Sequence, residues 1–214
     1  MRQTVRSAVL LATLALLAAC GSSPTTTLDV TWAAPQLPPA KSFKKLMIIT
    51  VAANEFVQES FQKQLAADLK KRGVNAEASG RYFSRYTDAE KARFKQSIDA
   101  SDADHILLAR VTFSDIKTFE DRGSVMGLGG ASSSDVNNVY STFARYVDPS
   151  SYAAGADASV KTVHSETSIF SHKGEKLIWS ARVRTDNAGS TTGAKYAPQY
   201  IEVILDAMRK DKLL

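Results

Sequence analysis

Three segments of the chain repeat apolar residues every three or four positions, which predicts amphipathic helices with one buried face. The first helix is expected to begin after Asn54 as its N-cap and to end at Gly73. The second follows a capping box at Thr87 and Glu90 and extends to about residue 100. The third starts near Pro198. The residues expected on the buried faces are Val57, Phe61, Leu65, Leu69, Phe94, Ile98, Ile201, Ile204, Leu205 and Met208.

Short apolar or alternating runs between these segments predict strands at residues 45–51, 74–78, 105–117, 139–147, 158–170 and 176–185. The 45–51 run is apolar throughout, which is typical of a strand buried on both faces. The 105–117 run turns polar on one face from Arg110 onward, so its far half is expected to be exposed on that side. A turn at residues 172–175 predicts an antiparallel hairpin of the last two strands, with Trp179, Ala181 and Val183 facing the core.

The resulting order is β-α-β-α-β-β-β-β-α, which predicts one α/β domain, with a mixed sheet of α+β character, over residues 43–214. Residues 20–42 hold four of the six prolines and many serines and threonines, which favours an extended tether. Leu28, Val30 and Trp32 alternate within this tether, however, so part of it is expected to lie against the domain as an edge strand.

The first 19 residues have the pattern of a secretory signal, with Arg2 and Arg6 followed by an apolar run too short to cross a bilayer. The sequence from Leu17 to Cys20 resembles the bacterial lipobox. That resemblance implies cleavage before Cys20 and acylation of this residue, so that a covalent lipid attaches the protein to a membrane. Gly21, in place of aspartate, implies the outer membrane. The alternative is an ordinary cleaved signal with an incidental cysteine.

Composition narrows the function classes. The 214 residues are 44% hydrophobic and 23% charged, which is typical of a globular protein. The net charge of +5 includes the two leader arginines and does not predict nucleic-acid binding. A single cysteine excludes an intrachain disulfide.

Several segments resemble a group of uncharacterised proteobacterial outer-membrane lipoproteins. They are Trp32 in its proline-containing surroundings and residues 43–49, 69–74, 103–107 and 174–181. The predicted architecture is similar to the amino-terminal domain of the translocation protein TolB and to the curli-export lipoprotein, which share an anticodon-binding-like arrangement. The resemblance implies protein binding in the periplasm.

Residue types that often perform catalysis are present without a catalytic pattern. His105, His164 and His172 lack the spacing of a metal site. The serines at 132–134 precede Asp135 but lack a nucleophile elbow. Glu166 and Asp186 lie on or beside predicted strands. We expect Glu166 to be an exposed cross-strand partner of Arg182 or Arg184. These patterns predict no enzyme, no cofactor and no metal site.

Four glycines (Gly123, Gly127, Gly129 and Gly130) mark a segment that matches no phosphate-binding motif. It contains three apolar residues, Val125, Met126 and Leu128. They either form a partner-contact loop or fold back onto the core, and the sequence leaves both open.

The sequence therefore predicts a non-catalytic, lipid-anchored periplasmic binding or scaffold protein, in cell-envelope assembly or transport. Its expected partner is a periplasmic protein or a second copy of the chain. The alternatives are an envelope-polymer hydrolase with dispersed Ser, His and acidic residues, and a subunit of a secretion apparatus.

Overall fold

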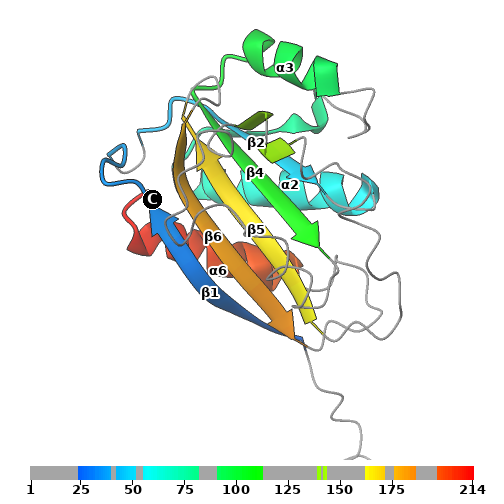
Figure 1. Cartoon of the computed structure of the whole chain (residues 1–214), viewed down its shortest axis with the longest axis vertical. Coiled ribbons are helices and arrows are strands. Elements are labelled where there is room, and N and C mark those ends of the chain that lie inside the picture. The colour runs from blue at the N-terminus through cyan, green and yellow to red at the C-terminus, as the bar shows by residue number, and fades with distance from the viewer. Residues whose placement is uncertain are drawn as a thin grey trace, which may run out of the picture.

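Strands from both halves of the chain meet in one mixed sheet in the computed structural model (Figure 1). The structure describes residues 24–39, 42–51, 55–81, 91–112, 139–140, 142–143, 162–171, 176–186 and 197–214. The elements in chain order are β1 (Thr25–Ala33), β2 (Leu46–Val51), α2 (Glu55–Lys71), β3 (Ala76–Ala78), the short 3-10 helix η1 (Ser79–Arg81), α3 (Lys91–Ala100), β4 (His105–Thr112), β5 (Thr162–Phe170), β6 (Leu177–Asp186) and α6 (Ala197–Lys210).

The sheet has the strand order β1-β6-β5-β4-β2-β3. β2 pairs in parallel with both β3 and β4, as crossover connections through α2 and α3 require. The β4–β5, β5–β6 and β1–β6 pairs are antiparallel. The fold is thus a single α/β domain with a mixed sheet, as the sequence predicts.

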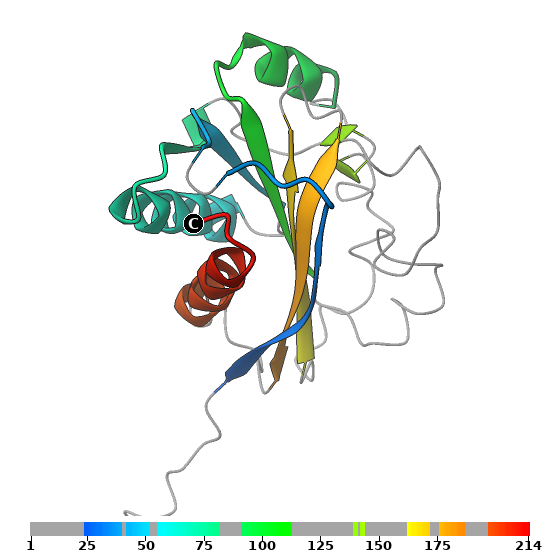
Figure 2. The ribbon, with the colours of Figure 1, turned by 90° about the vertical axis from the view of Figure 1, so that its left-hand side faces the viewer.

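Helices α2 and α6 cover one face of the sheet (Figure 2). The helix residues expected to face the core do so where they are described. Phe61, Leu65 and Leu69 of α2 and Ile201, Ile204, Leu205 and Met208 of α6 are all buried. They pack on Leu107, Ile169 and Trp179 from the middle of the sheet. Each of these side chains contributes about 1.5–3 kcal/mol by its burial.

The other face has a separate apolar cluster at the end of the sheet nearest α3. Phe94 and Ile98 of α3 are buried there with Ile106 and Leu108 of β4. Phe143 stacks on Phe94, with the ring centroids 3.8 Å apart. Both faces of β4 are therefore covered at its start, as predicted.

The end of α2 has the geometry that its sequence predicts. Gly73 has a φ of 86°, in the left-handed region that glycine adopts without strain. The N–H of Gly73 donates to the carbonyl of Lys70 and the N–H of Val74 donates to that of Leu69, which are the two hydrogen bonds of a Schellman motif.

One prediction about the strands needs correction. Residues 139–140 and 142–143 are helical, whereas the sequence pattern predicts a strand over 139–147. Val139 and Phe143 are four positions apart and both join the α3 cluster, which helical spacing allows. Residues 25–33 form the strand β1 at the edge of the sheet, paired with β6. The expected edge strand around Leu28, Val30 and Trp32 is confirmed.

Candidate functional site

Three charged side chains lie in register across the middle of the sheet, on the face opposite α2 and α6. Glu166 of β5 is the direct partner of Arg110 in β4 and of Arg182 in β6. Glu166 is 5% exposed and Arg110 is 7% exposed. We call Arg110, Glu166 and Arg182 the charged row. Because an acidic position lies between two basic positions, the register places opposite charges on neighbouring strands, an arrangement in which buried charges can offset one another.

The sequence identified the partner of Glu166 but not its environment. The cross-strand pairing with Arg182 is confirmed, whereas the expected exposure of Glu166 and of Arg110 is wrong. Alternation along one strand shows which residues share a face. It does not show which residues of neighbouring strands lie opposite one another. Opposite charges in register on neighbouring strands lower the cost of burying each charge.

His164 lies next to the charged row on β5. Its Nδ1 atom is 3.8 Å from Oδ2 of Asp29. Asp29 lies at an irregularity in β1, where the register shifts between Leu28 and Val30, and is therefore an extra residue in that strand. Burial lowers the pKa of His164 below its ordinary value of 6.5; Asp29 opposes this shift, and Arg182 and Arg184 add to it.

His105 lies at the other end of the β4–β5 pair. Residue 106 is paired with Phe170, whereas His164 is paired with Thr112. The His105 ring makes an edge contact with Phe43, with centroids 4.7 Å apart. Its Nδ1 is 3.0 Å from Asp104, which also accepts the N–H groups of Lys45 and Lys44. The two histidines therefore do not share a site. The hydrogen bonds of Asp104, beside His105, connect the start of β4 to the residues before β2.

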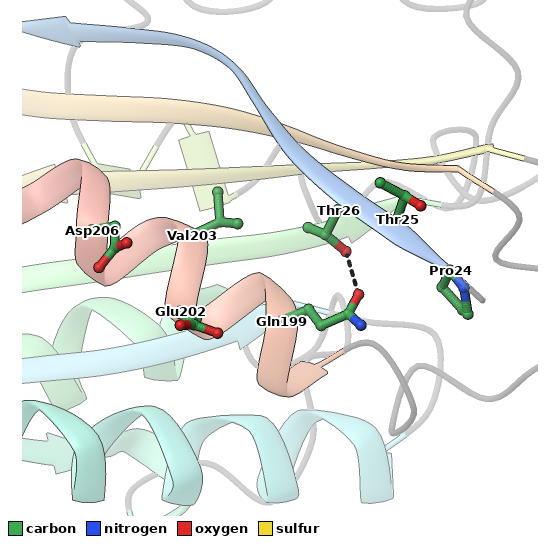
Figure 3. A pocket seen from close by; sticks show the side chains of 7 residues that line it. All are labelled: Pro24, Thr25, Thr26, Gln199, Glu202, Val203 and Asp206. Carbon is green, nitrogen blue, oxygen red and sulfur yellow. Dashed lines mark hydrogen bonds between the residues drawn. The ribbon is translucent and has the colours of Figure 1, made fainter.

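A groove of about 340 Å³ lies between the start of β1 and α6 (Figure 3). We call it the entry groove, since the described chain enters the domain there. Its lining residues are Pro24, Thr25, Thr26, Gln199, Glu202, Val203 and Asp206. No sequence motif indicates this groove, because its two walls are far apart along the chain and meet only through the β1–β6 pairing.

The entry groove has mixed walls, in which two threonines, a glutamine and two carboxylates lie beside Pro24 and Val203. The Thr26 hydroxyl donates to Oε1 of Gln199 at 3.3 Å and is hydrogen-bonded to the Thr185 hydroxyl at 3.0 Å. Glu202 and Asp206 are one helical turn apart on α6, and Arg209 donates to Asp206 at 2.7 Å. Such walls can accept hydrogen bonds and attract cationic groups.

Other predicted site residues lie outside the described residues. These are Cys20, the apolar loop residues Val125, Met126 and Leu128, and also His172, the serines at 132–134 and Asp135. Within the described part of the chain, no group of three or more His, Cys, Asp or Glu side chains is placed to hold a metal ion. In the same part, every helix is too short or too polar to cross a membrane.

No family model and no curated protein matches the chain. Among solved structures, the chain is similar to the PelC dodecamer from Paraburkholderia phytofirmans, in crystals of space group P6, and to a leucine-to-methionine variant of that dodecamer in space group C2. The variant is 12% identical over 85% of this chain and 96% of that one, with a TM-score of 0.41. The P6 form is 11% identical over 90% of this chain and 99% of that one, also with a TM-score of 0.41. A PDZ domain protein from Parabacteroides distasonis is 11% identical over 94% of this chain and 39% of that one, with a TM-score of 0.44. These likenesses are too distant to assign a function.

Proposed function

We propose that the chain is a non-catalytic, lipid-anchored binding or scaffold protein on the periplasmic face of the outer membrane, active in envelope assembly or transport. The main support is the position of β1. This strand begins five residues after Cys20 and is an integral part of the sheet, paired with β6 from Thr25 to Ala33. An acyl group on Cys20 would therefore attach the whole folded domain to the membrane.

The chemistry of the described residues is consistent with a scaffold. Glu166, a buried carboxylate in the middle of the sheet, faces two arginines of its own sheet. Its register between two basic positions supports a structural role for this carboxylate.

The anchoring part of the proposal is tested by labelled palmitate and by membrane fractionation. The parent protein should incorporate the label, and the Cys20→Ser variant should not and should leave the membrane fraction. Ser22→Ala is the matched control, since it alters a small residue of the same segment and should keep the label. Unmodified Cys20 in the mature parent would contradict the anchor.

The binding part of the proposal is tested at the apolar loop residues. Val125, Met126 and Leu128 are replaced together by serine, and in-cell crosslinking is followed by mass spectrometry. The parent should give one specific crosslinked species, either with an envelope protein or with a second copy, and the triple variant should lose it. An unchanged species in the triple variant would exclude this loop as the contact. A parent without any specific species would contradict the binding role.

A further inference from the structure

The described chain starts beside the entry groove, and its path there is fixed by the fold. Thr25 is paired with Asp186 at the end of β6, and Asp186 is also the partner of Thr162 at the start of β5. The Thr162 hydroxyl donates to Asp186 at 3.0 Å. The hydrogen bonds of Thr26 with Thr185 and Gln199 join the same strand to β6 and to the start of α6. The first residues of β1 are thus held by two other elements, β6 and α6, and the end of β6 is itself held by β5.

The distance from this point to the anchor is limited by chain length. Four peptide units separate Cys20 from Pro24. A fully extended chain spans at most about 3.6 Å per residue, so the Cα atom of Cys20 lies within about 14 Å of Pro24 in any conformation. Pro24 itself lines the entry groove (Figure 3). An acylated Cys20 therefore requires the membrane surface to be close to this groove.

The opposite end of the domain is much farther away. β6 has ten residues, and a rise of about 3.3 Å per residue separates its two ends by roughly 30 Å. α3 lies beyond the start of β4, at the end opposite to the start of β1 (Figures 1 and 2). The short connection at residues 20–24 thus predicts how the domain is oriented relative to the membrane, as well as its attachment to it.

We infer that the end of the domain formed by the starts of β1 and α6, including the entry groove, faces the lipid headgroups of the membrane that holds the anchor. This inference rests on the proposed acylation of Cys20. The groove walls are mainly threonine, glutamine and carboxylate side chains, which suit hydrated headgroups, and they expose Glu202 to the cationic groups of zwitterionic lipids. We therefore expect contact with headgroups rather than insertion among acyl chains. α3 then points away from the membrane.

The orientation is tested by energy transfer from a labelled cysteine to a headgroup-linked acceptor. The acylated protein is reconstituted in vesicles of phosphatidylethanolamine and phosphatidylglycerol. The cysteine is placed at the groove in one variant, Glu202→Cys, and on α3 in the matched control, Gln96→Cys. Both positions are exposed, so both variants should fold as the parent does. Transfer from the groove position should be at least about twofold more efficient, since the two ends of β6, between which the sheet extends, are roughly 30 Å apart.

The same two cysteine variants with a longer connection test how energy transfer depends on the length of chain between Cys20 and Pro24. About twelve Gly and Ser residues inserted between Ser23 and Pro24 add a root-mean-square length of roughly 20 Å. The insertion should lower transfer from Glu202→Cys toward the value of Gln96→Cys. Equal transfer from the two positions without the insertion, or higher transfer from α3, would overturn the inferred orientation. Absence of palmitate on Cys20 would instead contradict the proposed function. Palmitate labelling is measured independently of energy transfer, so the two failures can be distinguished.

Discussion

The charged row offers the sharpest test of the structure, through removal of the charge of Glu166. Glu166→Gln keeps the size of the side chain and leaves Arg110 and Arg182 facing a neutral amide. Leaving a buried charge without its opposite charge costs about 3–5 kcal/mol, and Arg110 stays buried in this variant. In a domain of this size, about 1 kcal/mol lowers the Tm by about 2–4 °C. We therefore expect the Tm to fall by roughly 6–20 °C.

The matched control is an exposed carboxylate in an ion pair. Glu59 pairs with Lys63 across one turn of α2, and both side chains are more than half exposed, at 55% and 69%. Glu59→Gln should cost less than about 1 kcal/mol, because surface ion pairs are screened by water. Thermal and urea unfolding followed by circular dichroism measures both variants. An effect of Glu166→Gln no larger than that of Glu59→Gln would refute the buried row.

A triple variant separates the charge from the packing. Arg110→Met, Glu166→Leu and Arg182→Met together remove every charge of the row and keep most of its volume. Apolar replacements of buried ion pairs are often neutral or stabilising. The triple variant should therefore be clearly more stable than Glu166→Gln. A triple variant that is less stable than Glu166→Gln would show that the row contributes net stability.

Two further variants test local features of the fold. The lowered pKa of His164 means that the unfolded state binds a proton more readily than the folded state, so the free energy of unfolding should fall as the pH drops below about 6.5. His164→Gln should reduce this loss between about pH 7 and pH 5 in urea titrations, and an unchanged pH profile would exclude His164 as its source. Gly73→Ala should cost about 1–2 kcal/mol, because the φ of 86° strains any residue with a Cβ, although that atom would meet no neighbour. Thermal unfolding measures this cost, and an unchanged Tm would contradict it.

The helices were the most predictable part of the fold. In α6, Ile201, Ile204, Leu205 and Met208 repeat on one face, and each is at most 2% exposed. The repeat depends only on local spacing, which the sequence displays directly. The segment around residue 140 was less predictable, because its apolar residues fit both a spacing of two and a spacing of four. Its contact with Phe94, which favours the helical form, is a tertiary interaction.

The candidate site was harder to predict than the fold. Glu166, Arg110 and Asp29 come from three different strands, and their proximity follows from the strand order and from the irregularity in β1. No spacing along the chain encodes that order. The entry groove likewise forms only where β1 and α6, the first and last described elements, lie side by side.

The strand order also determines when β1 can pair during folding of the newly made chain. β1 is the first strand of the described chain, yet its neighbour in the sheet is β6, the last one, with Thr25 opposite Asp186. Pairing of such distant segments closes a very long loop and is a slow step of folding. During synthesis, β1 should therefore stay unpaired until residues 177–186 of β6 have also been made. Newly made chains should remain sensitive to protease at their amino-terminal end until that moment, and become resistant only when the sheet is complete.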